Sequence, residues 1–125
     1  MSRKNIYKFT FWLIFFVIIV FSFLPGKMLG GMNEPDMKCR IDYIMHFFAF
    51  MLLNVMLVLW MGKQKWYIHT IILVACLIFA VVAEYMQMLI PLRAFNPVDI
   101  LCNFSGSIGG HIISIFTLFG VRKKV

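Results

Sequence analysis

The sequence predicts an all-α, polytopic membrane protein with four transmembrane helices and both termini on the cytoplasmic side. The first observation is the composition, because 62% of the 125 residues are hydrophobic and only 14% are charged. A soluble domain of this length buries too small a share of its surface to hide so many apolar side chains. The second is that the apolar residues form four runs, each close to the ~20 residues that cross a bilayer core. The third is that Lys and Arg lie beside these runs rather than on one polar face, so no nucleic-acid partner is expected.

The first run, about residues 6–24, follows a basic stretch and ends at Pro25. It resembles the opening of a signal peptide, but it is long and has no small-residue cleavage site before the proline. We therefore predict a retained transmembrane helix. Residues 25–41, which are rich in Gly and acidic residues, are predicted to be an extramembrane connector.

The other three runs are predicted as helices over about residues 42–61, 66–90 and 98–118. The link between the second and third helices, residues 62–65, is flanked by Trp60, Trp66 and Tyr67, as is typical of a membrane interface. The chain shows no internal repeat and no change of composition that would mark a second domain. Residues 1–125 are therefore predicted to form a single membrane domain.

The basic residues predict the orientation of this domain. With the N-terminus inside, eight of the 12 Lys and Arg residues fall on the cytoplasmic side, and four (Lys27, Lys38, Arg40 and Arg93) fall outside. Because cytoplasmic loops carry the excess of Lys and Arg, this count favours N-in and C-in. All five acidic residues then fall in the outer half or the outer loops: Glu34, Asp36, Asp42, Glu84 and Asp99.

The three cysteines indicate neither a disulfide framework nor a metal site. Their number is odd, and no CxxC or Cys/His ligand spacing occurs. Cys76 lies within an apolar run and is expected to be a small buried side chain. Whether Cys39 and Cys102 pair stays open. No cofactor and no metal ion are expected.

Polar residues concentrate near the outer ends of the last three helices. Asp42 and His46 are four residues apart and share one helix face. Glu84 and Gln87 share a face of the third helix. On the fourth helix, one stripe with spacings of three and four residues contains Asp99, Asn103, Gly106 and Gly110, with Ser107 and Ser114 beside it.

Several of these residues also fit purely structural roles. Asn96 and Pro97 match the first positions of a helix, so Asp99 would complete a helix start. Asp42 would do the same for the second helix through the helix dipole. Gly106 and Gly110 form a small-xxx-small pattern, which lets helix backbones approach closely.

Glu84 needs an explanation beyond such structural roles, because ionisable residues within membrane spans are costly and are commonly functional. It lies about six residues before the end of its predicted helix, or ~9 Å at 1.5 Å per residue. A carboxylate there needs a partner or a proton. Arg93, just beyond Pro91, and His46 are the candidate partners. In the inner half, Asn54 is expected to bond across helices and His111 to bond a neighbouring backbone group.

These residues resemble the VanZ-like family of small membrane proteins. The family pattern is an Asp, a His four residues later in an aromatic-rich helix, E-x-x-Q, an Arg, D-x-x-x-N and G-x-x-x-G. Here the matching residues are Asp42, His46, Glu84, Gln87, Arg93, Asp99, Asn103, Gly106 and Gly110. The residue after the Asp is often Lys in the family, whereas this chain has Tyr43. The resemblance implies a multi-pass protein of the bacterial plasma membrane with a role in envelope homeostasis or in resistance to glycopeptides such as teicoplanin.

Three functions are consistent with this pattern. In the first, the polar residues form a non-enzymatic site that binds a lipid headgroup, a cell-wall precursor or a glycopeptide. In the second, the protein is a membrane hydrolase or transferase in which His46 is the general base, oriented by Asp42 or Glu84. A metal ion bound by Asp42, His46, Glu84 and Asp99 would then activate the attacking water. In the third, the chain is a proton-linked transporter subunit, for which the inner half offers Asn54, His111 and Ser114. A chain this short would then assemble as a homo-oligomer.

Overall fold

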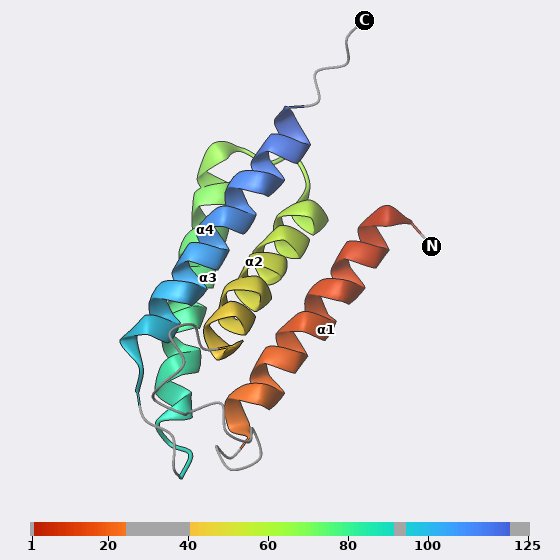
Figure 1. Cartoon of the computed structure of the whole chain (residues 1–125). Coiled ribbons are helices and arrows are strands. Elements are labelled where there is room, and N and C mark those ends of the chain that lie inside the picture. The colour runs from red at the N-terminus through yellow and green to blue at the C-terminus, as the bar shows by residue number, and fades with distance from the viewer. Residues whose placement is uncertain (1, 25–40, 92–94, 121–125) are drawn as a thin grey trace, which may run out of the picture.

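The computed structural model describes residues 2–24, 41–91 and 95–120 and places four helices in them, with no strand in these ranges. The helices are α1 (Arg3–Phe23), α2 (Ile41–Met61), α3 (Trp66–Gln87) and α4 (Pro97–Phe119) (Figure 1). Each is long and apolar enough to cross a membrane. The predicted four-helix membrane fold is therefore confirmed.

The ends of the helices follow local capping chemistry. α1 begins three residues earlier than expected because Ser2 is its N-cap and accepts a hydrogen bond from the Asn5 backbone N–H at 3.3 Å. α2 ends at Gly62, whose φ of 71° is accessible mainly to glycine and whose N–H donates to the Val58 carbonyl. α4 begins with Asn96 as N-cap and Pro97 in its first turn.

The end of α3 differs from the prediction. The helix stops at Gln87, and Met88, Leu89 and Ile90 continue it only as a tighter turn in which each N–H donates to the carbonyl three residues earlier. Pro91 explains the stop, since the residue before a proline disfavours the helical conformation. Glu84 is consequently in the last turn of α3, closer to the helix end than expected.

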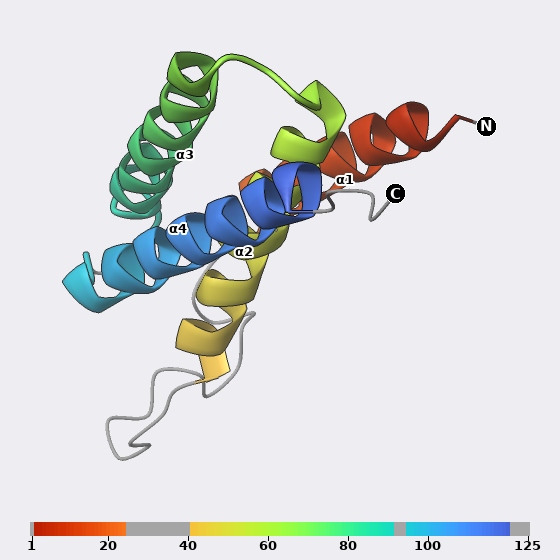
Figure 2. The same ribbon diagram turned by 90° about the horizontal axis from the view of Figure 1, so that it is seen from above.

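The helices alternate in direction, so α2 and α4 run parallel to each other, and the start of α1 and the end of α4 lie at the same end of the bundle (Figure 1). α4 lies directly against α2, and α3 stands to one side of this pair (Figure 2). We call the end where α3 stops and α4 begins the Glu84 end. The opposite end, where α3 begins, is the His69 end. At 1.5 Å per residue, Glu84 and His69 lie about 22 Å apart along α3.

The apolar core lies between α1, α2 and α3. It is formed by a cluster of Phe11, Ile18, Phe50, Leu53, Ala80 and Ala83. Phe15 and Phe79 stack beside it with ring centroids 4.9 Å apart. α2 therefore presents an apolar face to α1 and α3 and a different face to α4.

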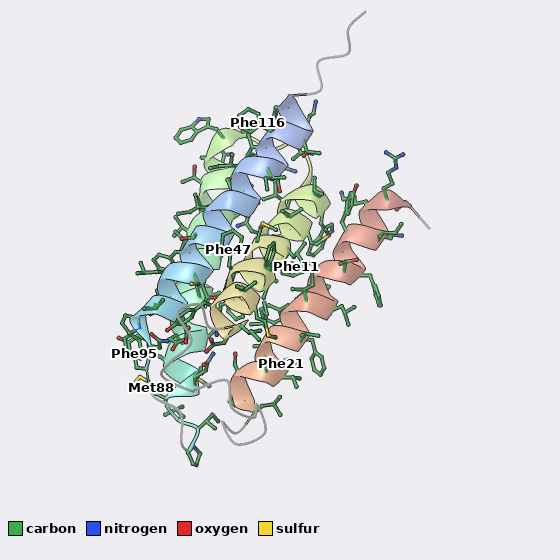
Figure 3. The ribbon with its side chains drawn as sticks, viewed as in Figure 1. Phe11, Phe21, Phe47, Met88, Phe95 and Phe116 are labelled. Carbon is green, nitrogen blue, oxygen red and sulfur yellow. The ribbon has the colours of Figure 1, made fainter. Side chains whose placement is uncertain are left out.

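The surface of the bundle is apolar along the helices, as Phe21 and Phe116 illustrate (Figure 3). A membrane span needs such a surface, because lipid replaces water as the solvent of the side chains. The buried residues of α4, in contrast, are small or polar: Asp99, Asn103, Gly106, Ser107, Gly110 and Ser114.

Candidate functional site

Glu84 connects the end of α3 to the start of α4. Its side chain is only 1% exposed, and Oε1 accepts a hydrogen bond from the Asn96 backbone N–H at 3.1 Å. Asn96 is the N-cap of α4, so the carboxylate lies at the positive end of the α4 dipole. The carboxylate therefore has a definite structural role at this end of the bundle.

Asn96 extends this contact to α2. Its Oδ1 accepts from the Val98 N–H at 3.1 Å, and its Nδ2 donates to the Tyr43 hydroxyl at 3.3 Å. A single side chain thereby caps one helix and binds another. Tyr43, Asn96 and Glu84 together join α2, α4 and α3 at the Glu84 end.

His46 and Asn103 form a second link between α2 and α4. The His46 Nδ1 and Asn103 Oδ1 atoms are 3.0 Å apart. Because a carbonyl oxygen only accepts, His46 carries a proton on Nδ1, and the lone pair of a neutral ring is then on Nε2. Asn103 is 1% exposed, so this hydrogen bond is shielded from solvent.

The two acids near helix starts occupy favourable electrostatic positions. Asp42 lies in the first turn of α2, where its Oδ1 accepts from the Tyr43 N–H at 3.2 Å. Asp99 lies in the first turn of α4, is 6% exposed, and its N–H donates to the Asn96 carbonyl at 3.1 Å. The helix dipole stabilises a negative charge at both places.

Two glycines allow these side chains to meet. A Cβ atom on Gly106 would overlap the carbonyl oxygen of Phe47, and one on Gly110 would overlap that of Met51. The same Cβ atoms would lie 3.1 Å from the Met51 nitrogen and 3.1 Å from the Met51 carbonyl carbon, respectively. Only glycine permits this approach of α4 to the α2 backbone.

The structure brings four of the predicted site residues, His46, Glu84, Asp99 and Asn103, to one end of the bundle from three helices. Tyr43 and Asn96, which the sequence did not single out as site residues, join them there. No side-chain hydrogen bond joins Gln87 to the described residues, and none joins His46 to Asp42 or Glu84 there. Arg93, Lys38, Arg40 and Cys39 lie outside the described residues, so the predictions that involve them remain predictions.

The geometry does not support the metal site considered for a hydrolase. Within residues 2–24, 41–91 and 95–120, no group of three His, Cys, Asp or Glu side chains could hold a metal ion. Asp42 bonds its own helix start, Glu84 bonds Asn96, and His46 bonds Asn103. Asn103, rather than Asp42 or Glu84, therefore orients His46.

Sequence reasoning did not anticipate three of the polar contacts. Tyr43 was seen only as a departure from a family lysine, yet its hydroxyl accepts from Asn96. His111 was expected to bond a backbone group, whereas its Nδ1 lies 3.2 Å from Asn54 Oδ1, which confirms only the expectation that Asn54 bonds across helices. His69, for which the sequence predicts no role, is buried at the opposite end and accepts the Gln64 N–H. The spacing of Asn54 and His111 gave no signal, because a contact across two helices depends on their register.

Four apolar helices, small and polar residues between α2 and α4, and buried carboxylates at one end define a small multi-pass membrane protein with a polar interior. The chain belongs to the VanZ/LLP1 family, whose model matches residues 2–119. The match covers α1 as well as the part from Asp42 to Gly110 that carried the sequence resemblance. Searches of curated proteins and of solved structures found no significant match.

Proposed function

We propose that the Glu84 end is a binding site for the polar part of an amphiphile, and that the protein is an accessory factor of the cell envelope. The ligand would be a lipid headgroup, a cell-wall precursor or a glycopeptide such as teicoplanin. The observation that carries the proposal is the convergence of Tyr43, His46, Glu84, Asn96, Asp99 and Asn103 from three helices at one end of an otherwise lipid-compatible bundle.

The chemistry of these residues suits such a ligand. Carboxylate, amide, imidazole and phenol groups provide both donors and acceptors, which polyhydroxylated headgroups and peptide amides require. The apolar surface beside this end, including Met88 just after α3 and Phe95 just before α4, would contact the acyl or aromatic part of the ligand (Figure 3).

The distribution of Lys and Arg supports an arrangement in the bacterial plasma membrane with the Glu84 end outside. In this orientation the site meets wall precursors and glycopeptides without their crossing the membrane. Arg93 follows Pro91 in the sequence and would add a positive charge for a phosphate or carboxylate group.

Susceptibility to teicoplanin tests the proposal. Bacterial cells that express the wild-type protein should tolerate more teicoplanin than cells with an empty vector, and Glu84→Gln, Arg93→Ala and Asp99→Asn should abolish this difference. The first and third substitutions keep the side-chain size, so the protein should still be present in the membrane at the wild-type level. Ser105→Ala is the matched control, because Ser105 is exposed on α4 and, among the described residues, its side chain bonds only the Leu101 carbonyl.

Wild-type tolerance in all three variants would contradict a role of this end in resistance. An unchanged susceptibility on expression of the wild-type protein would contradict the glycopeptide as ligand. Lipid and wall-precursor binding would then be measured by mass spectrometry of the protein released from the membrane.

One observation favours a second function, that of a membrane hydrolase or transferase on a lipid-linked substrate. Asn103 fixes the Nδ1 proton of His46, so Nε2 is available as a general base. Profiling of lipids and wall precursors in overexpressing cells tests this function. A species that is consumed by the wild type but not by His46→Gln would support it, and an unchanged inventory would contradict it.

A further inference from the structure

The His69 end contains a second buried polar cluster, distinct from the residues at the Glu84 end. It consists of Asn54 from α2, His69 from α3 and His111 from α4. Asn54 is 0% exposed and His69 is 4% exposed. His111 Nδ1 lies 3.2 Å from Asn54 Oδ1, and the rings of His69 and His111 have centroids 6.1 Å apart.

The hydrogen bonds determine where the protons of this cluster are. Asn54 Oδ1 accepts only, so His111 donates through Nδ1–H and a neutral His111 has its lone pair on Nε2. His69 Nε2 accepts the Gln64 backbone N–H at 3.4 Å, so the proton of a neutral His69 is on Nδ1. The cluster therefore offers donors at His69 Nδ1 and Asn54 Nδ2 and an acceptor at His111 Nε2.

The two donors are buried and have no oxygen or nitrogen hydrogen-bond partner in the part of the chain that the structure describes, and Asn54 Nδ2 has the weakly accepting sulfur of Cys76 beside it. Leaving such groups unpaired destabilises the folded protein, because their desolvation is not compensated by a hydrogen bond. In a membrane span, neither lipid nor bulk water replaces the missing partner. A small molecule that accepts from both donors and donates to His111 would satisfy the whole cluster.

A water molecule fits these requirements in chemistry and in size. A water oxygen that is hydrogen-bonded to a ring nitrogen at about 2.9 Å lies about 4 Å from the centre of that ring. Two rings that share one water at a bent angle then have centres about 6 Å apart, and the observed separation is 6.1 Å. A metal ion fits poorly, because the protonated Nδ1 of His69 has no lone pair to offer.

We propose that Asn54, His69 and His111 form an internal site that binds one water molecule and passes a proton between the two histidines. Buried polar groups commonly hold such waters with two to four hydrogen bonds. The site borders the link between α2 and α3, because His69 Nε2 accepts from the backbone N–H of Gln64, an exposed residue of that link.

The proton passes from His69 to His111 through the water molecule. A proton from the His69 end binds Nε2 of His69 and displaces the Gln64 N–H. His69 then releases its Nδ1 proton to the water, and the water gives one of its own protons to Nε2 of His111. His69 has gained one proton and lost one, the water is unchanged, and His111 has become an imidazolium.

The side chains around the cluster make other contacts, so the two histidines are the groups that exchange this proton. From α3, the thiol of Cys76 faces the Asn54 side chain. From α4, the Ser114 hydroxyl donates to the Gly110 carbonyl at 2.7 Å, and the Phe119 ring contacts His69 with centroids 5.9 Å apart. The nearest cation of the link, Lys63, lies over that Phe119 ring rather than at the histidines. α2 contributes only Asn54 to the cluster, and α1 contributes no residue.

Nuclear magnetic resonance of the full chain in lipid nanodiscs, with 15N-labelled histidine, tests the proposal on the wild-type protein itself. At high pH, His69 and His111 should both show the Nδ1–H tautomer, and the His69 Nδ1–H should give a cross-peak to water. On acidification, His111 should become an imidazolium while the neutral His69 changes from the Nδ1–H to the Nε2–H tautomer, as the proton transfer requires. Single His→Gln variants assign the signals.

Asn54→Leu should abolish the water cross-peak of His69, and His111→Gln should prevent the tautomer change of His69. Ser105→Ala should change neither of these signals. At high pH, an Nε2–H tautomer of His69, or an Nδ1–H without a water cross-peak in the wild type, would overturn the proposal. None of these signals depends on ligand binding at the Glu84 end.

Discussion

At the scale of single residues, the burial of Glu84 is explained by the helix that follows it. A carboxylate in the last turn of α3 faces the negative end of that helix dipole, which disfavours it. The Asn96 N–H at the start of α4 provides the opposite environment, a donor at the positive end of a dipole. Glu84 therefore fastens the α3–α4 hairpin in addition to any ligand that it binds.

Replacement of Glu84 separates its charge from its hydrogen bond. Glu84→Gln keeps an oxygen that accepts the Asn96 N–H, whereas Glu84→Ala leaves that donor without this partner. We expect the alanine variant to lose about 1–3 kcal/mol of unfolding free energy and the glutamine variant to lose less. Unfolding in mixed detergent micelles measures both, and equal stability of the alanine variant and the wild type would show that the hydrogen bond contributes nothing.

Tyr43 provides a second prediction at this scale. Tyr43→Phe removes the hydroxyl that accepts from Asn96 Nδ2 and should lower the unfolding free energy by about 0.5–1.5 kcal/mol. Tyr67→Phe is the control, because Tyr67 is exposed at the opposite end. A loss of the same size in both variants would assign the effect to the general removal of a phenol, not to this contact.

Part of the hydrogen bonding around Asn96 could be predicted from the sequence. The order Asn96, Pro97, Val98, Asp99 predicts the helix start, because capping depends only on neighbouring residues. The contact from Asn96 to Tyr43 joins residues that are 53 positions apart. Only the packing of α4 against α2 creates it, and a single sequence does not reveal that packing.

At the scale of helices, α2 and α4 are joined in one register along their length. His46 and Asn103 are 57 residues apart, and so are Asn54 and His111. α2 supplies the histidine of one pair and α4 supplies that of the other. Gly106 and Gly110 contact the α2 backbone in the same region, so small residues and polar pairs define one interface.

Alanine substitutions on α4 test this close approach. Gly106→Ala would bring a methyl group into the carbonyl of Phe47, which forces the helices apart and should cost about 1–3 kcal/mol, as overpacking does. Gly109→Ala is the matched control on the same helix, since its Cβ would meet nothing within 4 Å. Unfolding experiments should rank Gly106→Ala below the wild type and Gly109→Ala at or above it, and equal values for the two variants would contradict a backbone contact at Gly106.

The spacing along α4 was sufficient to predict its small and polar stripe. It was not sufficient to identify the partner, because α3 is adjacent in sequence and equally able to pack there. The structure shows that α2 is the main partner and that α3 makes fewer contacts with α4. The apolar face of α2 binds α1, which leaves its other face for α4.

At the scale of the whole molecule, the four helices of the described residues place the start of α1 and the end of α4 at one end of the bundle (Figure 1). Four apolar runs of about 20 residues made this number predictable. The excess of Lys and Arg near that end predicts that it faces the cytoplasm, with Arg3, Lys4 and Lys8 at the start of α1 and Lys63 and Lys65 between α2 and α3.

Cysteine labelling in intact cells tests this orientation. A Gln64→Cys variant without its native cysteines should resist a membrane-impermeant maleimide until the cells are broken. An Asn33→Cys variant in the same background should react in intact cells, because residue 33 lies in the predicted outer connector. The reverse pattern would place the Glu84 end in the cytoplasm and contradict its proposed contact with external ligands.

The shared register of α2 and α4 also has a consequence for biogenesis. During synthesis, α2 leaves the ribosome with His46 and Asn54 while the helix that pairs with them is still untranslated. α4 has the lowest mean hydropathy of the four helices, so it gains least from lipid on its own. We infer that insertion of α4 and its docking on α2 are coupled. Chains truncated after α3 would then expose the polar face of α2, with His46 and Asn54, to recognition by membrane quality-control proteases.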